Sequence, residues 1–582
     1  MDVFSFIKLI GGLAFFLYGM HVMSTGLERM AGGKLELLIK QMTSSKLKSI
    51  ILGIGITVAI QSSSAVTVML VGLVNSGIMQ IGQTIGIIMG SNIGTTLTAW
   101  ILSLVGIESD NVWMNLLKPE NFSLIFAFVG IMLLMLAKQD KKKDTGSIFI
   151  GFAILMFGMK LMSDAVSPLA NMPEFSTLLT AFKNPIIGVA VGTFFTGIIQ
   201  SSAASIGILQ ALALTGSITY GMAIPIIMGQ NIGTCVTAII SSIGVNKNAK
   251  KVAVIHISFN MIGTIIFIIL FYGIDAIVHF PFTNLPINAV GIALVHSIFN
   301  IATTLMLLPF SSVLEKIAQF VLKDDKADDK ETEQFLDMRL LTMPSVAISE
   351  CFNVSVNMAI LAKETLLSSI EIAGQYNDKL MHHIIESEDL IDKYEDQIGT
   401  YLVKISTKVL SSADTKKSSK ILHAIGDFER LGDHALNIAN TAKELYSKGL
   451  SFSDEATREL DVLADAIKYT LDITMSAYQN DDIQLATEVE PLELAIEDLI
   501  ATIRTRHIER LQTGACTIEM GFLLSEFLNN YERISDHCSN IAVAVIIVAN
   551  DTFDTHQYLN AIRHENSEFD SVYENFKEKF YV

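Results

Sequence analysis

The chain has 582 residues, with 41 Lys and Arg against 59 Asp and Glu, and a formal net charge of −18. Residues 1–310 hold 16 basic and 11 acidic residues, whereas residues 311–582 hold 25 basic and 48 acidic residues. This division excludes a single soluble domain, and the lack of a basic surplus argues against nucleic acid as a partner. The 4 cysteines form no CxxC pair, which argues against a disulfide framework and a thiolate zinc site.

Apolar runs recur through the first 310 residues, and each is long enough to cross the ~30 Å hydrocarbon core of a lipid bilayer. They predict membrane-embedded segments near residues 4–27, 50–78, 80–106, 121–137, 147–165, 185–215, 218–245, 252–278 and 286–310.

Basic loops predict the orientation of these segments. Lys and Arg gather in loops 28–48, 138–144 and 246–251, which are therefore expected in the cytoplasm. Loop 163–184 is poor in basic residues and is expected outside. The acidic C-terminal part follows the last span and is expected inside, because long domains do not obey the charge rule.

The first part of the chain repeats itself at an offset of 139 residues. Gln61-Ser62-Ser63 recurs as Gln200-Ser201-Ser202, and the segment Asn92 to Thr95 recurs as Asn231 to Thr234. The first span runs inward and its counterpart at 147–165 runs outward, so the repeats are inverted. Inverted repeats are typical of secondary transporters, whose substrate site lies near the membrane midplane.

Each Gln-Ser-Ser motif lies in the middle of an apolar stretch that is too long for one simple span. A broken helix or re-entrant hairpin is expected there, because irregular backbone at that depth must line a cavity or be buried in protein. Hydroxyl and amide oxygens suit Na⁺, and N–H groups at half-helix starts suit an oxyanion. The neutrality of these stretches also fits an uncharged solute, and such polar residues also join membrane helices together.

The paired motifs resemble the hallmark of the type II sodium-dependent phosphate cotransporter family, over about residues 1–310. The resemblance implies phosphate binding by five serines: Ser62, Ser63, Ser64, Ser201 and Ser202. It implies that sodium, the coupling ion, is bound by Gln61, Asn92, Thr95, Gln200, Asn231 and Thr234. Ala203 stands where the first motif has Ser64, so the two half-sites are not equivalent.

A local pair of motifs reads His-x-x-Phe-Asn, at His256 to Asn260 and at His296 to Asn300. An intramembrane histidine can take part in a proton relay. The histidines can instead pack and hydrogen-bond between helices, and this second interpretation is favoured.

The soluble part begins after a linker assigned to 311–344, whose residues 323–334 are densely charged. Apolar residues at three- and four-residue spacing through 345–550 predict a helical bundle. Its carboxylate motifs occur twice and resemble those of the PhoU family, which is built of duplicated three-helix bundles. The resemblance suggests Fe or Zn at Glu388, Asp392, Glu429, Asp433, Glu493, Glu497, Glu532 and Asp536, although a solvated charged face is an equal alternative. No role is assigned to the tail 551–582.

The sequence therefore predicts an all-α protein with a polytopic membrane domain of inverted repeats (about 4–137 and 147–278) and re-entrant hairpins, followed by a cytoplasmic PhoU-like domain. The expected function is sodium-coupled symport of inorganic phosphate across the cell membrane, the inner membrane of a bacterium. A carrier of another oxyanion or a neutral solute, or a phosphate sensor, stays open as an alternative. An enzyme is not expected, because no P-loop or nucleophile elbow is present. A homodimer or a cytoplasmic regulatory partner is open.

Overall fold

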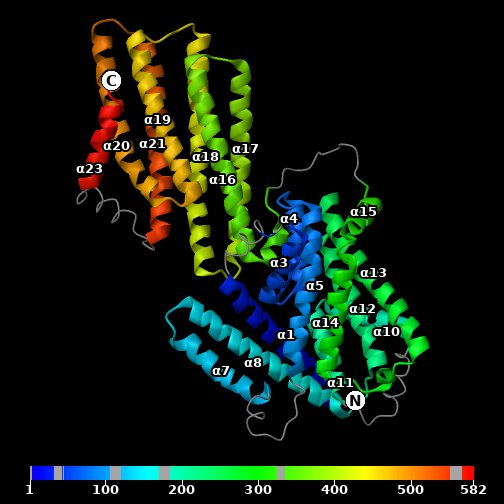
Figure 1. Cartoon of the computed structure of the whole chain (residues 1–582). Helices are drawn as coiled ribbons and strands as arrows, with labels where there is room; N and C mark the ends of the chain where they lie inside the picture. Colours follow the sequence, from blue (N-terminus) through cyan, green and yellow to red (C-terminus); the bar gives the residue numbers. More distant parts are fainter. Residues whose placement is uncertain are drawn as a thin grey trace. The chain divides into compact units, whose positions relative to one another are not determined.

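The chain forms two compact units, which are described separately (Figure 1). The membrane unit comprises Met1–Glu333 and Asp337–Val346, and the bundle unit comprises Gln334–Leu336 and Ala347–Val582. The described residues are helical, with no β-strand beyond one bridge between Thr219 and Pro286, so the expected all-α class is confirmed. The computed structural model describes residues 3–31, 42, 45–104, 119–168, 184–323, 335–550 and 567–582.

The membrane unit consists of two repeats with the same order of helices. The first contains α1 (Val3–Ala31), α3 (Lys46–Ile60), α4 (Ser63–Asn75), α5 (Ile81–Ser103) and α7 (Pro119–Leu136). The second contains α8 (Asp140–Val166), α10 (Pro185–Ile199), α11 (Ser202–Ala213), α12 (Tyr220–Ser241) and α13 (Lys247–Val278). The segments after the repeats are α14 (Ala289–Leu307), α15 (Ser311–Val321) and the 3₁₀ helix η5 (Met338–Thr342).

Two of these last segments lie inside the region 311–344, which the sequence assigned to a linker. α15 forms because Leu314 and Ala318 make a buried apolar stripe. η5 is capped by the preceding Asp337, whose carboxylate accepts a hydrogen bond from the Arg339 N–H at 2.8 Å. Residues 324–334, most of the charged stretch, lie outside the described residues, as do the parts of loops 28–48 and 163–184 at 32–41, 43–44 and 169–183.

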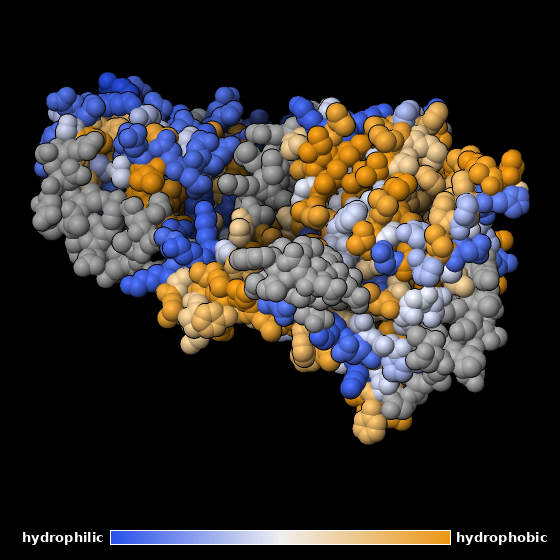
Figure 2. Space-filling view, turned by 60° about the horizontal axis from the view of Figure 1, so that its bottom comes forward, coloured by the Kyte–Doolittle hydropathy of each residue, from blue (hydrophilic) through white to orange (hydrophobic). Residues whose placement is uncertain are grey.

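The surface of the membrane unit suits a lipid bilayer. Among the described residues, 7 helices are long and apolar enough to cross a membrane, and six of them belong to this unit: α1, α5, α8, α12, α13 and α14. Hydrophobic residues cover much of the visible face of this unit in Figure 2, whereas the bundle helices are mostly hydrophilic. Large apolar side chains that protrude include Phe4, Leu124, Met135, Phe194, Ile269, Ile277 and Leu305.

Helices α1 and α8, which are counterparts in the two repeats, pack against each other through glycines. A Cβ added at Gly12 would lie 3.0 Å from the Gly158 carbonyl oxygen, and one at Gly19 would lie 2.7 Å from that of Gly151. Residue numbers rise along α1 as they fall along α8, so the helices are antiparallel. Opposite directions of counterpart helices are what inverted repeats require.

Each repeat also contains a parallel pair of helices in backbone contact. A Cβ at Gly90 of α5 would lie 2.0 Å from the Ile50 carbonyl oxygen of α3. At the equivalent place, a Cβ at Gly229 of α12 would lie 2.1 Å from the Val189 carbonyl oxygen of α10. Because α3 and α5 are parallel, the intervening α4 returns toward the side where α3 began. The pair α3–α4 is therefore a re-entrant hairpin, and α10–α11 is its counterpart, as predicted.

The bundle unit consists of two three-helix halves. The first half is α16 (Pro344–Gly374), α17 (Asp378–Ser406) and α18 (Ser412–Ser447), and the second is α19 (Asp454–Asn480), α20 (Ile483–Gln512) and α21 (Ile518–Asn550). α16 is apolar enough to span a membrane, but its Ser355 hydrogen-bonds Tyr478 of α19 at 2.8 Å inside the bundle. The expected helical bundle of two three-helix halves is thus confirmed.

The tail 551–582, to which the sequence analysis assigned nothing, contains the helix α23 (Ser567–Lys579). α23 packs on α20, where Lys577 Nζ lies 2.9 Å from an Asp498 oxygen and Tyr573 also bonds that carboxylate. The side chain of Phe576 is buried at this contact. Residues 551–566 lie outside the described part of the chain.

Candidate functional site

Both hairpins break at the glutamine of the Gln-Ser-Ser motif. Gln61 has φ 56° and Gln200 has φ 57°, which places both in the left-handed region. Residues other than glycine seldom adopt this conformation, and where it persists the surrounding structure must hold it. The same conformation at two positions 139 residues apart indicates that the break is a built feature of the repeat.

A serine caps the helix that follows each break. The Oγ of Ser62 accepts a hydrogen bond from the Ala65 N–H at 3.1 Å, and the Oγ of Ser201 accepts from the Ala204 N–H at 3.2 Å. Both serines are half-buried. Helices α4 and α11 therefore begin inside the membrane unit, each with the positive end of its dipole at the tip of a hairpin.

The remaining predicted phosphate-binding serines lie in the first turns of these two helices. Ser63 is buried at the start of α4, and Ser64 beside it is half-buried. Ser202 is half-buried at the start of α11. The structure therefore places each serine triplet or pair at one helix N-terminus, where hydroxyls and first-turn N–H groups are both available as donors to an anion.

The first tip is held by α5. Thr98 Oγ1 donates a hydrogen bond to Gln61 Oε1 at 2.9 Å, and Gln61 Nε2 donates to the Val58 carbonyl at 2.7 Å. Below the tip, Thr57 of α3 donates to Ser91 of α5 at 2.8 Å. Gln61, a predicted sodium ligand, is buried, and its side-chain oxygen and nitrogen both hold the tip.

Among the described residues, no such contact with a neighbouring span holds the second tip. Gln200 is exposed, and Thr237, the counterpart of Thr98, donates to the Thr234 carbonyl of its own helix at 2.9 Å. The tip is braced within the hairpin, because Thr196 of α10 donates to Ser205 of α11 at 2.8 Å.

The other predicted sodium ligands lie buried on α5 and α12. Thr95 and Thr234 donate to carbonyls one turn earlier, at 3.0 and 2.9 Å. Asn231 Nδ2 likewise donates to the Ile227 carbonyl at 3.0 Å. Asn92 differs, since its Nδ2 reaches Asn260 Oδ1 of α13 at 3.5 Å. Three of these four therefore bond only their own helix in the contacts described.

Gln210 of α11 joins the second hairpin to α5, next to the residue that holds the first tip. This fully buried side chain donates through Nε2 to the Ala99 carbonyl of α5 at 3.0 Å and to the Ala289 carbonyl at 3.1 Å. Ala99 follows Thr98, which holds Gln61, so both hairpins meet α5 within one turn. Sequence reasoning missed Gln210, and its isolated amide within an apolar run was the available signal.

The His-x-x-Phe-Asn motifs are buried in α13 and α14. Asn260 Nδ2 donates to the His256 carbonyl at 3.1 Å, and Asn300 Nδ2 donates to the His296 carbonyl at 2.9 Å. Phe267 and Phe299 also pack edge to face, with centroids 5.2 Å apart. These contacts suit the packing interpretation of the motifs.

The carboxylates of the motifs in the first half of the bundle lie close enough to repel one another. Burial, followed by repulsion from Asp392 and its neighbours, raises the pKa of Glu388. Burial and repulsion also raise the pKa values of Asp392 and Glu429. Arginines lie beside carboxylates in both halves, since Arg430 bonds Asp433 at 2.9 Å and Arg533 bonds Asp536 at 3.0 Å. In the second half, Arg504 also bonds Glu532 at 2.7 Å.

These carboxylates do not form a metal site in the structure. Among the described residues, no group of three or more His, Cys, Asp and Glu is arranged to hold a metal ion. The prediction of Fe or Zn at Glu388, Asp392, Glu429, Asp433, Glu493, Glu497, Glu532 and Asp536 therefore has no support from the geometry.

The fold defines a class: a multi-pass membrane protein of inverted repeats with two re-entrant hairpins, joined to a duplicated helical bundle. The family model described as Na+/Pi-cotransporter matches residues 15–164 and 154–296, and the PhoU domain model matches residues 356–442 and 460–545. The chain belongs to the Na+/Pi-cotransporter family and carries PhoU domains in its C-terminal half.

Relatives are found for the whole chain and for each part. YjbB of Escherichia coli (strain K12), whose name proposes inorganic phosphate export, is 22% identical over 565 residues, covering 93% of this chain and 97% of YjbB. YqeW of Bacillus subtilis (strain 168) is 30% identical over 311 residues, 53% of this chain and 96% of YqeW.

The bundle has relatives of its own. A PhoU homologue of Thermotoga maritima, named as a phosphate-specific transport system accessory protein, is 27% identical over 195 residues, 33% of this chain and 82% of that protein. The crystal structure of PhoU from Pseudomonas aeruginosa aligns with a TM-score of 0.33 and 21% identity, over 35% of this chain and 97% of that one.

Proposed function

We propose that the chain is a sodium-coupled symporter of inorganic phosphate, in which the two hairpin tips bind the anion. The observation that carries the proposal is the pair of serine-capped helix starts at Ser62 and Ser201, each following a left-handed break. Hydroxyls and N–H groups at the positive end of a helix are donors that match phosphate oxygens.

Sodium coupling follows from the charge of the surroundings. No Lys, Arg, Asp or Glu occurs from Ser49 through Gly106 or from Asn184 through Asn246. Helix dipoles supply only partial positive charge, so an anion bound between these stretches needs a co-bound cation. Gln61, Asn92 and Thr95, with their counterparts Gln200, Asn231 and Thr234, are the proposed oxygen ligands of sodium.

The proposed orientation places the bundle in the cytoplasm, because Lys46 and Lys48 begin α3 and three lysines follow Asn246 at the start of α13. The PhoU-like domain would then regulate transport from inside. Its likeness to proteins named as accessory to phosphate-specific transport supports a regulatory part in phosphate handling.

The test is uptake of radiolabelled phosphate into proteoliposomes with an inward Na⁺ gradient, against an equal K⁺ gradient. Phosphate should accumulate under the Na⁺ gradient and not under the K⁺ gradient. Ser63→Ala and Ser202→Ala should each weaken phosphate affinity about 10- to 100-fold, the effect of losing one hydrogen bond to an ion. Ser242→Ala, which removes a hydroxyl that donates to the Ile239 carbonyl one turn earlier, is the control. Unchanged affinity in both tip variants would refute the proposed phosphate site.

Direction and substrate need separate measurements, because the name of YjbB proposes export. Vesicles preloaded with phosphate should lose it fastest when the Na⁺ gradient points outward if the symport is reversible. Export that is indifferent to Na⁺ would favour an exporter instead. Competition by arsenate, sulfate and a neutral solute distinguishes phosphate from the other substrate classes, and binding without flux would favour the sensor.

A further inference from the structure

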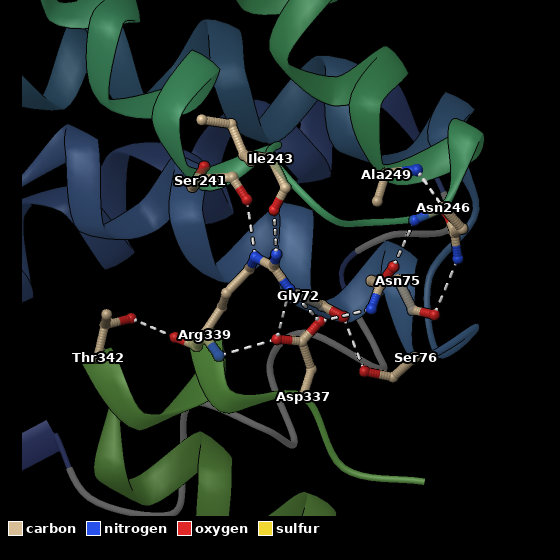
Figure 3. A network of polar contacts seen from close by, with 10 residues as sticks. All are labelled: Gly72, Asn75, Ser76, Ser241, Ile243, Asn246, Ala249, Asp337, Arg339 and Thr342. Carbon is tan, nitrogen blue, oxygen red and sulfur yellow. Dashed lines mark hydrogen bonds and ion pairs between the residues drawn. The ribbon is translucent and has the colours of Figure 1, made fainter. Parts of the chain in front are cut away.

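The cytoplasmic end of the first hairpin, in the proposed orientation, is fastened by residues that follow the last span (Figure 3). Asn75 ends α4, and its Nδ2 donates to an Asp337 carboxylate oxygen at 2.7 Å. The same asparagine meets the second repeat: its Oδ1 accepts from the Asn246 N–H at 2.9 Å, and its carbonyl accepts from Asn246 Nδ2 at 3.0 Å. α4 is thereby joined to the start of α13.

Arg339 joins the same residues to the end of α12. Its Nε donates to the Ser241 carbonyl at 2.7 Å and its Nη2 donates to the Ile243 carbonyl at 2.8 Å. Its Nη1 lies 3.2 Å from both carboxylate oxygens of Asp337. The guanidinium thus satisfies carbonyls at the negative end of α12 while it orients the carboxylate that holds Asn75.

Leu340 adds an apolar contact to these polar ones. It is fully buried, and a Cβ built at Gly72 of α4 would lie 2.9 Å from Leu340 Cδ2. Three residues of one short segment therefore hold α4. Asp337 bonds Asn75 at the end of α4, Arg339 bonds the end of α12 and orients Asp337, and Leu340 packs against the last turns of α4. We call Asp337, Arg339 and Leu340 the latch.

The latch has a consequence for the hairpin, because α4 begins at the serine tip and ends at the latch. α4 is 13 residues long, a rigid rod of about 20 Å at 1.5 Å per residue, so a displacement of its end is carried to Ser63 and Ser64. The chain leads from η5 through Met343 to Pro344, where α16 begins, and from Ala347 on α16 belongs to the bundle unit.

We propose that the latch positions the first hairpin and closes it on the side where α4 ends. Asp337 and Arg339 are positioning residues that act on the serine tip through α4. The part of the proposal that concerns transport rests on the proposed function. The closure itself does not, because it concerns access to the tip and not the identity of the solute.

The test measures access to the tip from each side of the membrane in the full-length protein. Ser64→Cys, in a Cys516→Ser background, is labelled with a membrane-impermeant thiol reagent in right-side-out and inside-out vesicles; the other three cysteines are buried. Arg339→Ala should raise labelling from the side of the latch at least about threefold, a modest population shift, and should not raise it from the other side. Arg339→Lys should lie between Arg339→Ala and the parent.

Controls separate closure from folding. Arg458→Ala removes an arginine that bonds the Asp454 carbonyl of its own helix and should leave labelling unchanged. If Arg339→Ala does not fold, Gly72→Ala crowds Leu340 without removing a charge, and it should show the same one-sided increase. Equal labelling in parent and latch variants, or an equal increase from both sides, would overturn the proposal.

A kinetic measurement links the latch to transport. Arg339→Ala should change the maximal rate of phosphate flux and leave its KM close to that of the parent, because the serines are untouched. An altered KM with an unaltered maximal rate would assign Arg339 to the binding site instead. If no phosphate flux exists in the parent, the proposed function fails while the labelling result still stands.

Discussion

The two hairpins share a backbone but not their surroundings. Both glutamines have a left-handed backbone conformation, and the hydrogen bonds of the two serine caps have nearly the same length, 3.1 and 3.2 Å. Yet Gln61 is bound by Thr98 of α5, whereas Gln200 is exposed and Thr237 bonds its own helix. The difference teaches that the repeat specifies the break, and tertiary contacts decide which tip is held.

A second difference between the hairpins follows from two residues that the repeats do not share. Thr57 and Thr196 are counterparts, but Thr57 bonds Ser91 on the neighbouring span and Thr196 bonds Ser205 on the other arm of its hairpin. The counterpart of Ser91 is Gln230, and that of Ser205 is Val66. Thus the first hairpin is tied to its span at this level, and the second hairpin is tied to itself.

The largest effect is expected where the repeats are alike. Gly90→Ala and Gly229→Ala each place a Cβ about 2 Å from a backbone carbonyl oxygen that cannot rotate away. Each should destabilise the protein by about 3–5 kcal/mol, at the upper end for single substitutions. Thermal unfolding in detergent checks this, with Gly55→Ala, which meets nothing within 4 Å, as the control. Tolerance at one position only would show that the two pairs are not equivalent.

A smaller and unequal effect is expected from the threonines at the tips. Thr98→Val leaves the buried Gln61 oxygen without its donor and should cost about 1–3 kcal/mol. Thr237→Val removes only a bond within its own helix and should cost about 0.5 kcal/mol or less. The same unfolding assay measures both. Equal losses would contradict the difference between the tips.

Substitution of the two buried serines tests the second difference, which is the partner that each hairpin's threonine bonds. Ser91→Ala and Ser205→Ala each remove the acceptor of a buried threonine hydroxyl, at a cost of about 1 kcal/mol. Hydrogen exchange should then increase between α3 and α5 in the first variant and between α10 and α11 in the second. Increased exchange in the opposite hairpin would show that the two braces are coupled.

The smallest effect is expected in the bundle, whose halves also differ. The pKa values of Glu388 and Asp392 are raised in the folded state, so these carboxyls lower the free energy of unfolding of the bundle at neutral pH. The lost stability returns as pH falls toward the ordinary pKa range of carboxyls, because both groups then become protonated. Glu388→Gln with Asp392→Asn should therefore melt higher than the parent at neutral pH, and the gap should close on acidification. Glu532→Gln, which loses the partner of Arg504, should melt no higher than the parent.

Much of this architecture could be predicted from sequence. The motifs at an offset of 139 residues predicted both breaks, because each places polar residues within an apolar run. The same offset combined with the basic loops predicted that the repeats are inverted. The sequence could not predict that Gln61 is hydrogen-bonded by a neighbouring span and Gln200 is not, since Thr98 and Thr237 are the same residue type at equivalent positions. Arg339 was missed because one arginine near a charged linker has no periodic signal, and its role depends on carbonyls 96 and 98 residues away.

The glycine seam between α1 and α8 has a consequence for assembly. Gly12 meets Gly158, and their counterparts Gly151 and Gly19 meet each other in the same way. A surface of this kind is self-complementary under a two-fold axis, as in an isologous dimer. Two separate chains of half this length, inserted in opposite orientations, could pair through the same surface without any new contact.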